Sequence, residues 1–273
     1  MTSSDRSRAQ TTMKSLRLVE ELHERGTGRV THLADDLDMS KSTVHNHLST
    51  LRDCGYVVKD GDNYRLGLKF LKLGGLERSR TELYRSARPE VETLSSEQSK
   101  TIVLATEELT EGVILAQLGA QPRDTEWYAG KRFSLLGTPE GEAMLACFPD
   151  DRIRSVVEDA PEIDVDELFE YLATLRDRGY VTYPTEQGDE ARHVAAPIHS
   201  DESDVLGALG LIERRDTDGT DSDDLIEMVT TVANQINLRL EQSWYGSEDV
   251  VTAKHSLSAY VGSNSSGIDG EEF

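Results

Sequence analysis

Apolar residues recur at helical spacing close to the N-terminus of the chain. In the segment TMKSLRLVEELHER, Leu16, Val19 and Leu22 lie along one stripe with Leu18 beside it, and Gly26 follows. Side chains three and four residues apart share one face of a helix, and glycine commonly ends a helix. The segment is therefore predicted to be an amphipathic helix.

Two more helices are predicted directly after the first. Residues 28–30 can form a short strand, and Thr31 is expected to cap a short helix. Ser40 then offers its hydroxyl to the exposed amides of a third helix, which Gly55 ends. The apolar positions of this third helix are Val44, Leu48 and Leu51. Helix, short helix, turn and helix in this order is the helix-turn-helix arrangement.

The polar side of the third helix is the predicted DNA-reading face. Steps of about 100° per residue put Ser42, Asn46 and Ser49 opposite the apolar stripe. Asparagine can pair with adenine through a donor and an acceptor, and Lys41 or His45 can reach a phosphate or a guanine. The alternative is an ordinary packed helix with a solvated Asn46, and the ordered set of neighbouring elements argues against it. The DNA-binding candidates on this helix are Ser40, Lys41, Ser42, Thr43, His45, Asn46 and Ser49.

A hairpin is predicted after the third helix. The run YVVKDGDNYRLG alternates apolar and polar residues around Asp60 and Gly61, and an Asp-Gly pair between two short strands is a hairpin signal. Such a two-stranded wing would set Lys59 and Arg65 near the DNA backbone. Cations there position the protein and do not read the DNA sequence.

The second half of the chain mixes strands with helices. A linker helix is expected over residues 76–88 and another from Pro89, because proline suits the first turn of a helix. Residues 100–118 contain two apolar runs around a turn at 107–112, and TPEGEAMLACF begins a helix with Thr138 as its cap. We expect an α+β fold with an N-terminal winged helix-turn-helix and a C-terminal α/β domain around an antiparallel sheet. The expected parts are a disordered N-terminus (1–11), the winged helix-turn-helix (12–75), the linker helix (76–88), the C-terminal domain (89–245) and a flexible acidic tail (246–273).

Charge is distributed unevenly between the two halves. The chain has 51 acidic and 29 basic residues, but residues 1–75 hold 10 acidic and 12 basic ones. The near-neutral N-terminal part, residues 1–75, is called the reading head below. It can therefore approach DNA while the acidic part lies further away. Arginine greatly outnumbers lysine and aromatic residues are few, which resembles proteins of salt-loving archaea; the alternative is an ordinary acidic cytosolic protein. In molar salt the Debye length falls to about 3 Å, so net-charge repulsion is strongly screened.

Several classes of protein are disfavoured. The polar N-terminus has no signal-peptide core and no apolar run approaches the roughly 20 residues of a membrane-spanning helix, so we expect a soluble, cytoplasmic protein. Cys54 and Cys147 lack the spacing of a disulfide framework or a zinc site, and Cys147, His193 and His199 form no metal-ligand motif. No GxSxG, HExxH or GxxxxGK[ST] motif is present, so no catalytic residue, cofactor or metal is expected. The alternative is an enzyme that uses Cys147 as its nucleophile.

Three segments of the first half resemble one known family. They are KSLRLVEELHERG, LADDLDMSKSTVHNHLSTLRDCGYV and YRLGLKFLKLG. Together they resemble the winged helix-turn-helix of the IclR family of transcriptional regulators, in a haloarchaeal form. The resemblance extends over roughly residues 13–242 and implies that the second half is a GAF-like domain that binds a small-molecule effector. The family commonly has arginine where Asn46 stands, so the operator sequence cannot be carried over.

The same resemblance implies an effector site in the second half. Its signature segments resemble TPEGEAMLA, RDRGYVTYPTEQGDEARHVAAPI and GALGLIE. Pro139 has no N–H to donate, and Glu140 and Glu142 add negative charge, so a small organic acid is a poor fit and a neutral polar or larger aromatic ligand is favoured. A dimerisation domain without ligand, with His193 as an ordinary surface histidine, is the alternative. The effector-binding candidates are Thr138, Glu140, Gly141, Tyr183, Arg192, His193, Gly210 and Ile212.

The expected function is regulation of a metabolic operon. The protein is expected to form a homodimer or tetramer that places winged helices in successive major grooves of double-stranded operator DNA. A small-molecule effector would then change the separation or orientation of the heads. A metabolite-processing enzyme, or a ligand-free dimerisation module, fused to a winged helix is the alternative.

Overall fold

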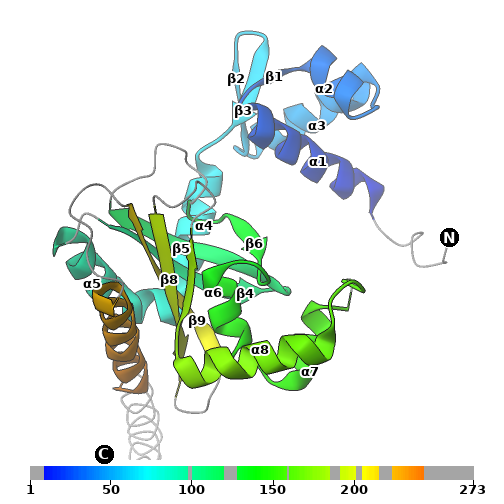
Figure 1. The fold of residues 1–273 in the computed structure, drawn as a ribbon. Coiled ribbons are helices and arrows are strands. Elements are labelled where there is room, and N and C mark those ends of the chain that lie inside the picture. The colour runs from blue at the N-terminus through cyan, green and yellow to red at the C-terminus, as the bar shows by residue number, and fades with distance from the viewer. Residues whose placement is uncertain are drawn as a thin grey trace, which may run out of the picture. The chain divides into compact units, whose positions relative to one another are not determined.

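The chain forms two compact units that meet between residues 77 and 78. The computed structural model describes residues 9–97, 100–119, 128–158, 160–184, 191–200, 205–214 and 223–242. The expected acidic tail and residues 1–8 of the expected disordered N-terminus lie outside these ranges. The first helix begins at Gln10, two residues earlier than predicted. Figure 1 traces both units.

The N-terminal unit is a winged helix-turn-helix. Its described elements are α1 (Gln10–Arg25), β1 (Gly28–Arg29), α2 (Val30–Asp36), α3 (Lys41–Asp53), β2 (Val57–Asp60) and β3 (Asn63–Leu66). The strands pair antiparallel in the order β1-β3-β2. The predicted turn lies between β2 and β3, where Gly61 has a φ of 59°, a left-handed conformation that glycine adopts without strain.

Two local predictions in this unit are wrong. The buried stripe of α1 is Leu18 and Leu22, whereas Leu16 is 51% exposed. The helix turns Leu18 toward the core that also contains Val44 and Leu48. Thr31 is not the cap of α2, because that helix begins at Val30 and Arg29 holds the cap position.

Two helices then join the units. They are α4 (Lys69–Arg80) and α5 (Glu82–Glu97), so the break falls near Thr81 and neither the predicted linker helix nor a helix start at Pro89 is correct. Pro89 lies inside α5, where proline normally costs a hydrogen bond. Four apolar side chains at helical spacing bury this helix against the sheet, which offsets that cost: Leu83, Ala87, Val91 and Leu94.

The C-terminal unit is built on an antiparallel sheet. Six strands of the described chain pair in the order β6-β5-β4-β9-β8-β7. Their bounds are β4 (Thr101–Glu108), β5 (Glu111–Gly119), β6 (Arg132–Ser134), β7 (Val181–Pro184), β8 (Ala191–His199) and β9 (Val205–Arg214). The helices beside them are α6 (Pro139–Leu145), α7 (Asp150–Val156), α8 (Val165–Arg178) and a helix over residues 223–242.

Helices cover both faces of this sheet. One face packs against α5 and the helix of residues 223–242, drawn in orange (Figure 1). The other face packs against α6, α7 and α8. Neighbouring side chains of a strand point to opposite faces: Val194 of β8 belongs to the first core and Ala195 to the second. This alternation decides which polar residues can meet.

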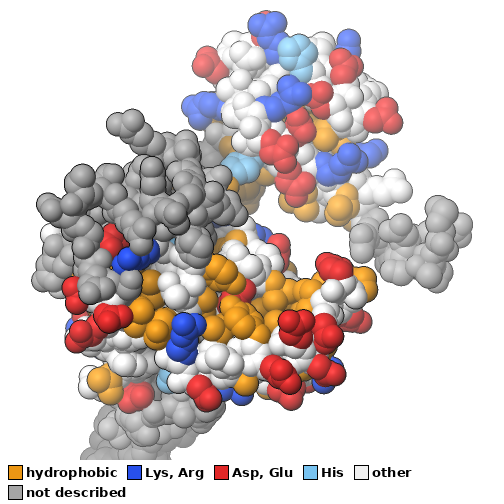
Figure 2. Space-filling model, viewed as in Figure 1, with side chains coloured by type: hydrophobic (Ala, Val, Ile, Leu, Met, Phe, Trp, Pro, Cys, Tyr) orange, Lys and Arg blue, Asp and Glu red, His pale blue; other side chains and the backbone are white. Residues whose placement is uncertain are grey.

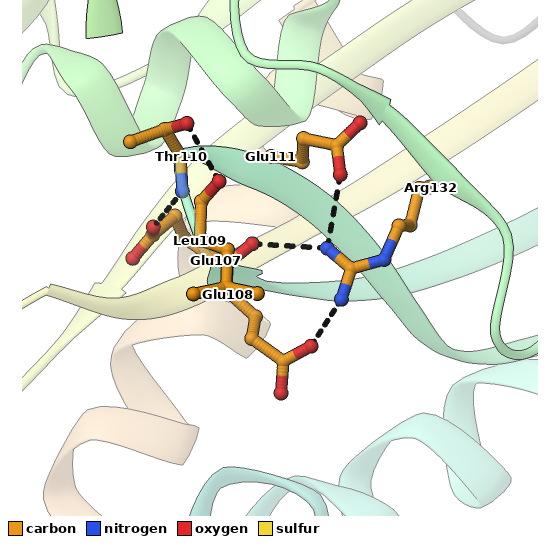
Figure 3. A network of polar contacts seen from close by, with 6 residues as sticks. All are labelled: Glu107, Glu108, Leu109, Thr110, Glu111 and Arg132. Carbon is orange, nitrogen blue, oxygen red and sulfur yellow. Dashed lines mark hydrogen bonds and ion pairs between the residues drawn. The ribbon is translucent and has the colours of Figure 1, made fainter. Parts of the chain in front are cut away.

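The predicted hairpin between β4 and β5 is confirmed. Leu109 and Thr110 form its tip with φ values of 57° and 66°. The carboxylate of Glu107 accepts the Thr110 N–H at 2.7 Å, and Arg132 donates to the Glu108 carbonyl at 3.0 Å and to Glu111 at 3.1 Å (Figure 3). These contacts hold the tip to β6. Among the described residues, no helix is long and apolar enough to cross a membrane.

Candidate functional sites

The start of α3 is capped as predicted. The Ser40 hydroxyl oxygen accepts the backbone N–H of Thr43 at 3.1 Å. The same oxygen lies 2.9 Å from the Ser42 hydroxyl and 2.8 Å from the Thr43 hydroxyl. A serine at this position satisfies an amide that the helix leaves without a partner. The first turn of α3 is therefore ordered before any DNA contact.

The two sides of α3 separate as the sequence predicts. Val44 and Leu48 are fully buried in the core of the N-terminal unit. Five candidates are exposed, and Thr43 and Ser49 are half-buried. Asp53, the first carboxylate along the helix, pairs with Arg52 at 3.1 Å. The exposed candidates are Ser40, Lys41, Ser42, His45 and Asn46.

One histidine of α3 has a role that the sequence did not suggest. His47 Nδ1 lies 2.7 Å from the Ser15 hydroxyl oxygen, which joins α3 to α1. The two residues are 32 positions apart. Spacing along the chain carries no signal for such a contact. His47 is thus a positioning residue that fixes how α3 lies on the first helix.

The two cations of the wing lie on opposite faces of the hairpin. The register pairs Lys59 with Tyr64 and Val58 with Arg65. Lys59 therefore lies on the core side, with Nζ 5.6 Å from the centre of the Tyr64 ring. Arg65 lies on the outer side and is exposed. A single flat DNA-facing surface cannot present both cations, although each is accessible from its own side.

In the C-terminal unit, α6 brings two carboxylates inside the protein. All seven residues of this helix are buried, including Glu140 and Glu142. Pro139 holds the first-turn position, as predicted. The helix crosses the sheet face formed by β7, β8 and β9, and its carboxylates meet polar groups there.

Glu140 forms a buried pair with His193. Their Oε1 and Nε2 atoms are 2.7 Å apart, and the side chains are 0% and 6% exposed. The alternative of an ordinary surface histidine is therefore wrong. Gly210 makes the pair possible, because a Cβ there would lie 1.9 Å from Glu140 Oε1. In the part of the chain that the structure describes, Glu140 Oε2 is buried without a hydrogen-bond partner.

Glu142 accepts three hydrogen bonds. Its Oε1 accepts the Tyr183 hydroxyl at 2.6 Å and the Gly137 N–H at 3.1 Å. Its Oε2 accepts the Tyr171 hydroxyl at 2.7 Å. Burial and the hydrogen bond to Glu142 raise the pKa of Tyr183 well above its ordinary value, and they also raise the pKa of Tyr171. Tyr171 lies on α8 and was not predicted, since nothing in its own segment points to a buried carboxylate.

Three predicted effector residues have other surroundings. Arg192 neighbours His193 on β8, so its side chain points to the opposite face of the sheet. The Thr138 hydroxyl donates to the Ser134 carbonyl at 2.7 Å. Gly141 packs so closely on Leu135 that an added Cβ would lie 2.3 Å from its carbonyl oxygen. The residues that do meet are Glu140, Glu142, Tyr171, Tyr183, His193, Gly210 and Ile212, with Ile212 opposite His193 in the strand register.

The cysteine alternative has no chemical support in the structure. Burial raises the pKa of the Cys147 thiol, and Arg176 opposes this shift only in part. A raised pKa disfavours the thiolate that a nucleophile requires. Among the described residues, no three His, Cys, Asp or Glu side chains are grouped to hold a metal ion.

These features define a class of protein: a winged helix-turn-helix joined to a separate α+β domain. Residues 11–61 match the IclR helix-turn-helix domain, and residues 77–238 match the C-terminal domain of the bacterial transcriptional regulator IclR. The chain belongs to the IclR family. It is a DNA-binding transcriptional regulator with an effector-binding C-terminal domain, and the family is not enzymatic.

Relatives match over most of their length. A Halobacterium salinarum protein named "Probable HTH-type transcriptional regulator ArcR" is 29% identical over 84% of this chain and 93% of its own. XynR of Escherichia coli is 25% identical over 74% and 85%.

Solved structures confirm the fold. IclR of Thermotoga maritima has a TM-score of 0.68 at 18% identity and covers 86% of this chain and 99% of its own. An IclR homologue of Microbacterium hydrocarbonoxydans, solved with 4-hydroxybenzoate, has a TM-score of 0.69 at 20% identity and covers 84% and 98%. The predicted α+β architecture is confirmed.

Proposed function

We propose that α3 reads the operator through Ser42, His45 and Asn46, with Lys41 at its start. The observation that carries this is the separation of α3 into a buried side and a polar, accessible side behind a Ser40 cap. A helix held in this way can enter the major groove with its N-terminal residues against base edges. Lys59 and Arg65 then contact phosphates from the two sides of the wing.

A pair of variants tests these roles. Asn46→Ala should cost about 1–3 kcal/mol at one base position and relax the preference there, because a base-reading contact is lost. Lys59→Ala should weaken binding similarly on all sequences and reduce the salt dependence. Genomic footprinting first identifies the DNA site that the protein binds. Binding to this site and to random DNA is then measured by fluorescence anisotropy. Equal losses for both variants on both DNAs would contradict the assigned roles.

We also propose that the working form is a homodimer or a dimer of dimers. Large apolar side chains are exposed in and beside α4 and on α1, and a second copy would bury them. They are Met13, Leu16, Leu68, Leu71, Leu73 and Leu76. Two heads would then read half-sites separated by about one helical turn of DNA, or a multiple of it.

The sensory role belongs to the buried site on α6. A metabolite that engages Glu140, Tyr183 and His193 with different affinities in two states would shift the separation of the heads and control a metabolic operon. The test measures operator affinity while metabolites are titrated. The metabolites are chosen from the pathway whose genes lie next to the bound genomic site. If none changes operator affinity or the melting temperature, a ligand-free dimerisation module is the better description.

The acidic composition fits a cytoplasm rich in salt, and we propose a haloarchaeal type of regulator on this ground. The chain has a formal net charge of −22, and all of this excess lies outside the reading head. Screening at molar salt shortens electrostatic repulsion to about 3 Å. Because this screening removes repulsion between the acidic part and DNA, operator affinity should fall less steeply with added potassium chloride than the loss of phosphate contacts alone would give.

A further inference from the structure

The three groups around Glu142 form a carboxylate-binding site that the protein itself fills. The Gly137 N–H and the hydroxyls of Tyr171 and Tyr183 converge on one carboxylate at 2.6 to 3.1 Å. All three donors are neutral, so the contacts described for this carboxylate are hydrogen bonds and not ion pairs. Because Glu142 occupies these donors, a free carboxylate would have to displace a tethered one.

The neighbouring carboxylate has an unused acceptor. Glu140 Oε1 meets His193, while Oε2 is buried and, among the described residues, unpartnered. A buried acceptor without a donor is costly, so a ligand that donates a hydrogen bond there gains free energy. Glu142 lies two residues further along α6, and its partner Tyr183 is opposite His193 in the strand register. Two carboxylates near one histidine favour a cation and repel an anion.

An apolar cluster adjoins the polar pair. Ile212, opposite His193 in the strand register, packs with Val103, Ile114 and Phe133 on the sheet. Figure 2 shows hydrophobic side chains gathered on the visible face of this unit, whereas Val103, Ile114 and Ile212 themselves are buried. A ligand with a short apolar chain next to its donating group would match both surroundings.

We propose that the effector is a small organic cation with an apolar chain, whose ammonium or guanidinium group donates to Glu140 Oε2, and that Glu142 is a built-in carboxylate which excludes anionic effectors. This inference rests on the effector role proposed above. It reverses the ligand charge of the relative that was solved with 4-hydroxybenzoate.

The first experiment compares matched probes on the full-length protein. Butylammonium, butyrate and butanol share one apolar chain, and their binding is measured by saturation-transfer NMR and thermal shift at constant ionic strength. Butylammonium should bind and raise the melting temperature, and butyrate and butanol should not. Glu140→Gln should lower butylammonium affinity by about tenfold or more, since the ammonium would lose a carboxylate acceptor and meet a neutral amide. Binding of butyrate to the wild-type protein, or no binding of butylammonium, overturns the proposal.

The second experiment empties the filled site. Glu142→Ala leaves three donors facing a space of carboxylate size, so acetate should raise the melting temperature of this variant and not that of the wild-type protein. Methylammonium at the same concentration is the control. Adding Tyr171→Phe should remove part of the rescue, because one donor is lost. If acetate has no effect on a folded Glu142→Ala variant, the donors are not a carboxylate site; if the variant does not fold, the probe comparison on the wild-type protein decides.

Operator binding separates this inference from the proposed function. If butylammonium binds but operator affinity does not change, the ligand class stands and the effector role fails. If butyrate changes operator affinity and butylammonium does not, the effector role stands and the ligand class fails.

Discussion

At the scale of single residues, one glycine decides whether two buried polar side chains can meet. Glu140 comes from α6, His193 from β8 and Gly210 from β9. A Cβ at position 210 would lie 1.9 Å from Glu140 Oε1 and 3.2 Å from His193 Nε2. The carboxylate therefore occupies space that any side chain at this position would take.

Gly210→Ala should destabilise the C-terminal unit by about 1–3 kcal/mol, because the added methyl group overpacks a buried polar pair. The free energy of unfolding in urea, followed by circular dichroism, measures this. Gly74→Ala on α4 is the control: its Cβ meets no described atom within 4 Å, and an exposed helical glycine gains roughly 0.4–1 kcal/mol on this change. A neutral Gly210→Ala would mean that the pair is not formed.

The two tyrosines around Glu142 should lose their protons at a higher pH than ordinary tyrosines. Burial first, and then the hydrogen bond to Glu142, raise the pKa of Tyr183 above its ordinary value of 10.0. The folded state therefore keeps a proton that the unfolded state loses, so this contribution to stability is complete below pH 10 and declines as the pH rises further. A pH titration followed by phenolate absorbance counts the tyrosines that ionise only at high pH. This number should be smaller in Tyr183→Phe than in the wild-type protein. A Tyr183 that ionises like a free tyrosine would contradict the structure.

At the scale of elements, local signals predicted α3 and the two hairpins well but misplaced α5. A cap and a turn depend on residues a few positions apart, and the Ser40 cap and the Gly61 turn are confirmed. Pro89 looked like a helix start because proline is common there. Four buried apolar side chains, two before Pro89 and two after it, keep α5 continuous instead.

The cap and the reading face can be separated by two serine variants. Ser40→Ala should lower the stability of the N-terminal unit by about 1 kcal/mol, because the Thr43 amide loses its acceptor. Ser42→Ala should change stability by less than about 0.5 kcal/mol, because this side chain is exposed. Thermal unfolding of both variants is compared with operator affinity. A larger stability loss for Ser42→Ala would show that the cap is misassigned.

At the scale of the whole molecule, exposed leucines suggest how two copies meet. Leu68 and Leu71 are 77% and 72% exposed, which is unusual for neighbouring large apolar side chains. The reading heads of a symmetric dimer need such a contact to fix their spacing on DNA.

Leu71→Glu should shift the protein toward monomer and weaken operator binding, because a charge would be buried between the copies. Leu109→Glu at the β4–β5 tip is a matched control, since Leu109 is 80% exposed and lies in the other unit. Sedimentation at several concentrations measures the association. If both variants remain dimeric, the interface lies elsewhere.

The sequence by itself determined the elements whose causes are local. Helical spacing, the Ser40 cap, the Asp60-Gly61 turn and the family resemblance predicted a winged helix-turn-helix on an α+β sensory domain. The polar side of α3 followed from the same periodicity. The helical spacing, the cap and the turn each depend on residues within about one turn of each other.

Only the tertiary structure decided which polar residues meet. The register of β8 sends His193 to Glu140 and Arg192 to the other face, and the hairpin register separates Lys59 from Arg65. Tyr171 and Glu142 are 29 positions apart, and His193 and Glu140 are 53 apart. Contacts at such separations arise from strand pairing and helix packing, for which local spacing holds no information.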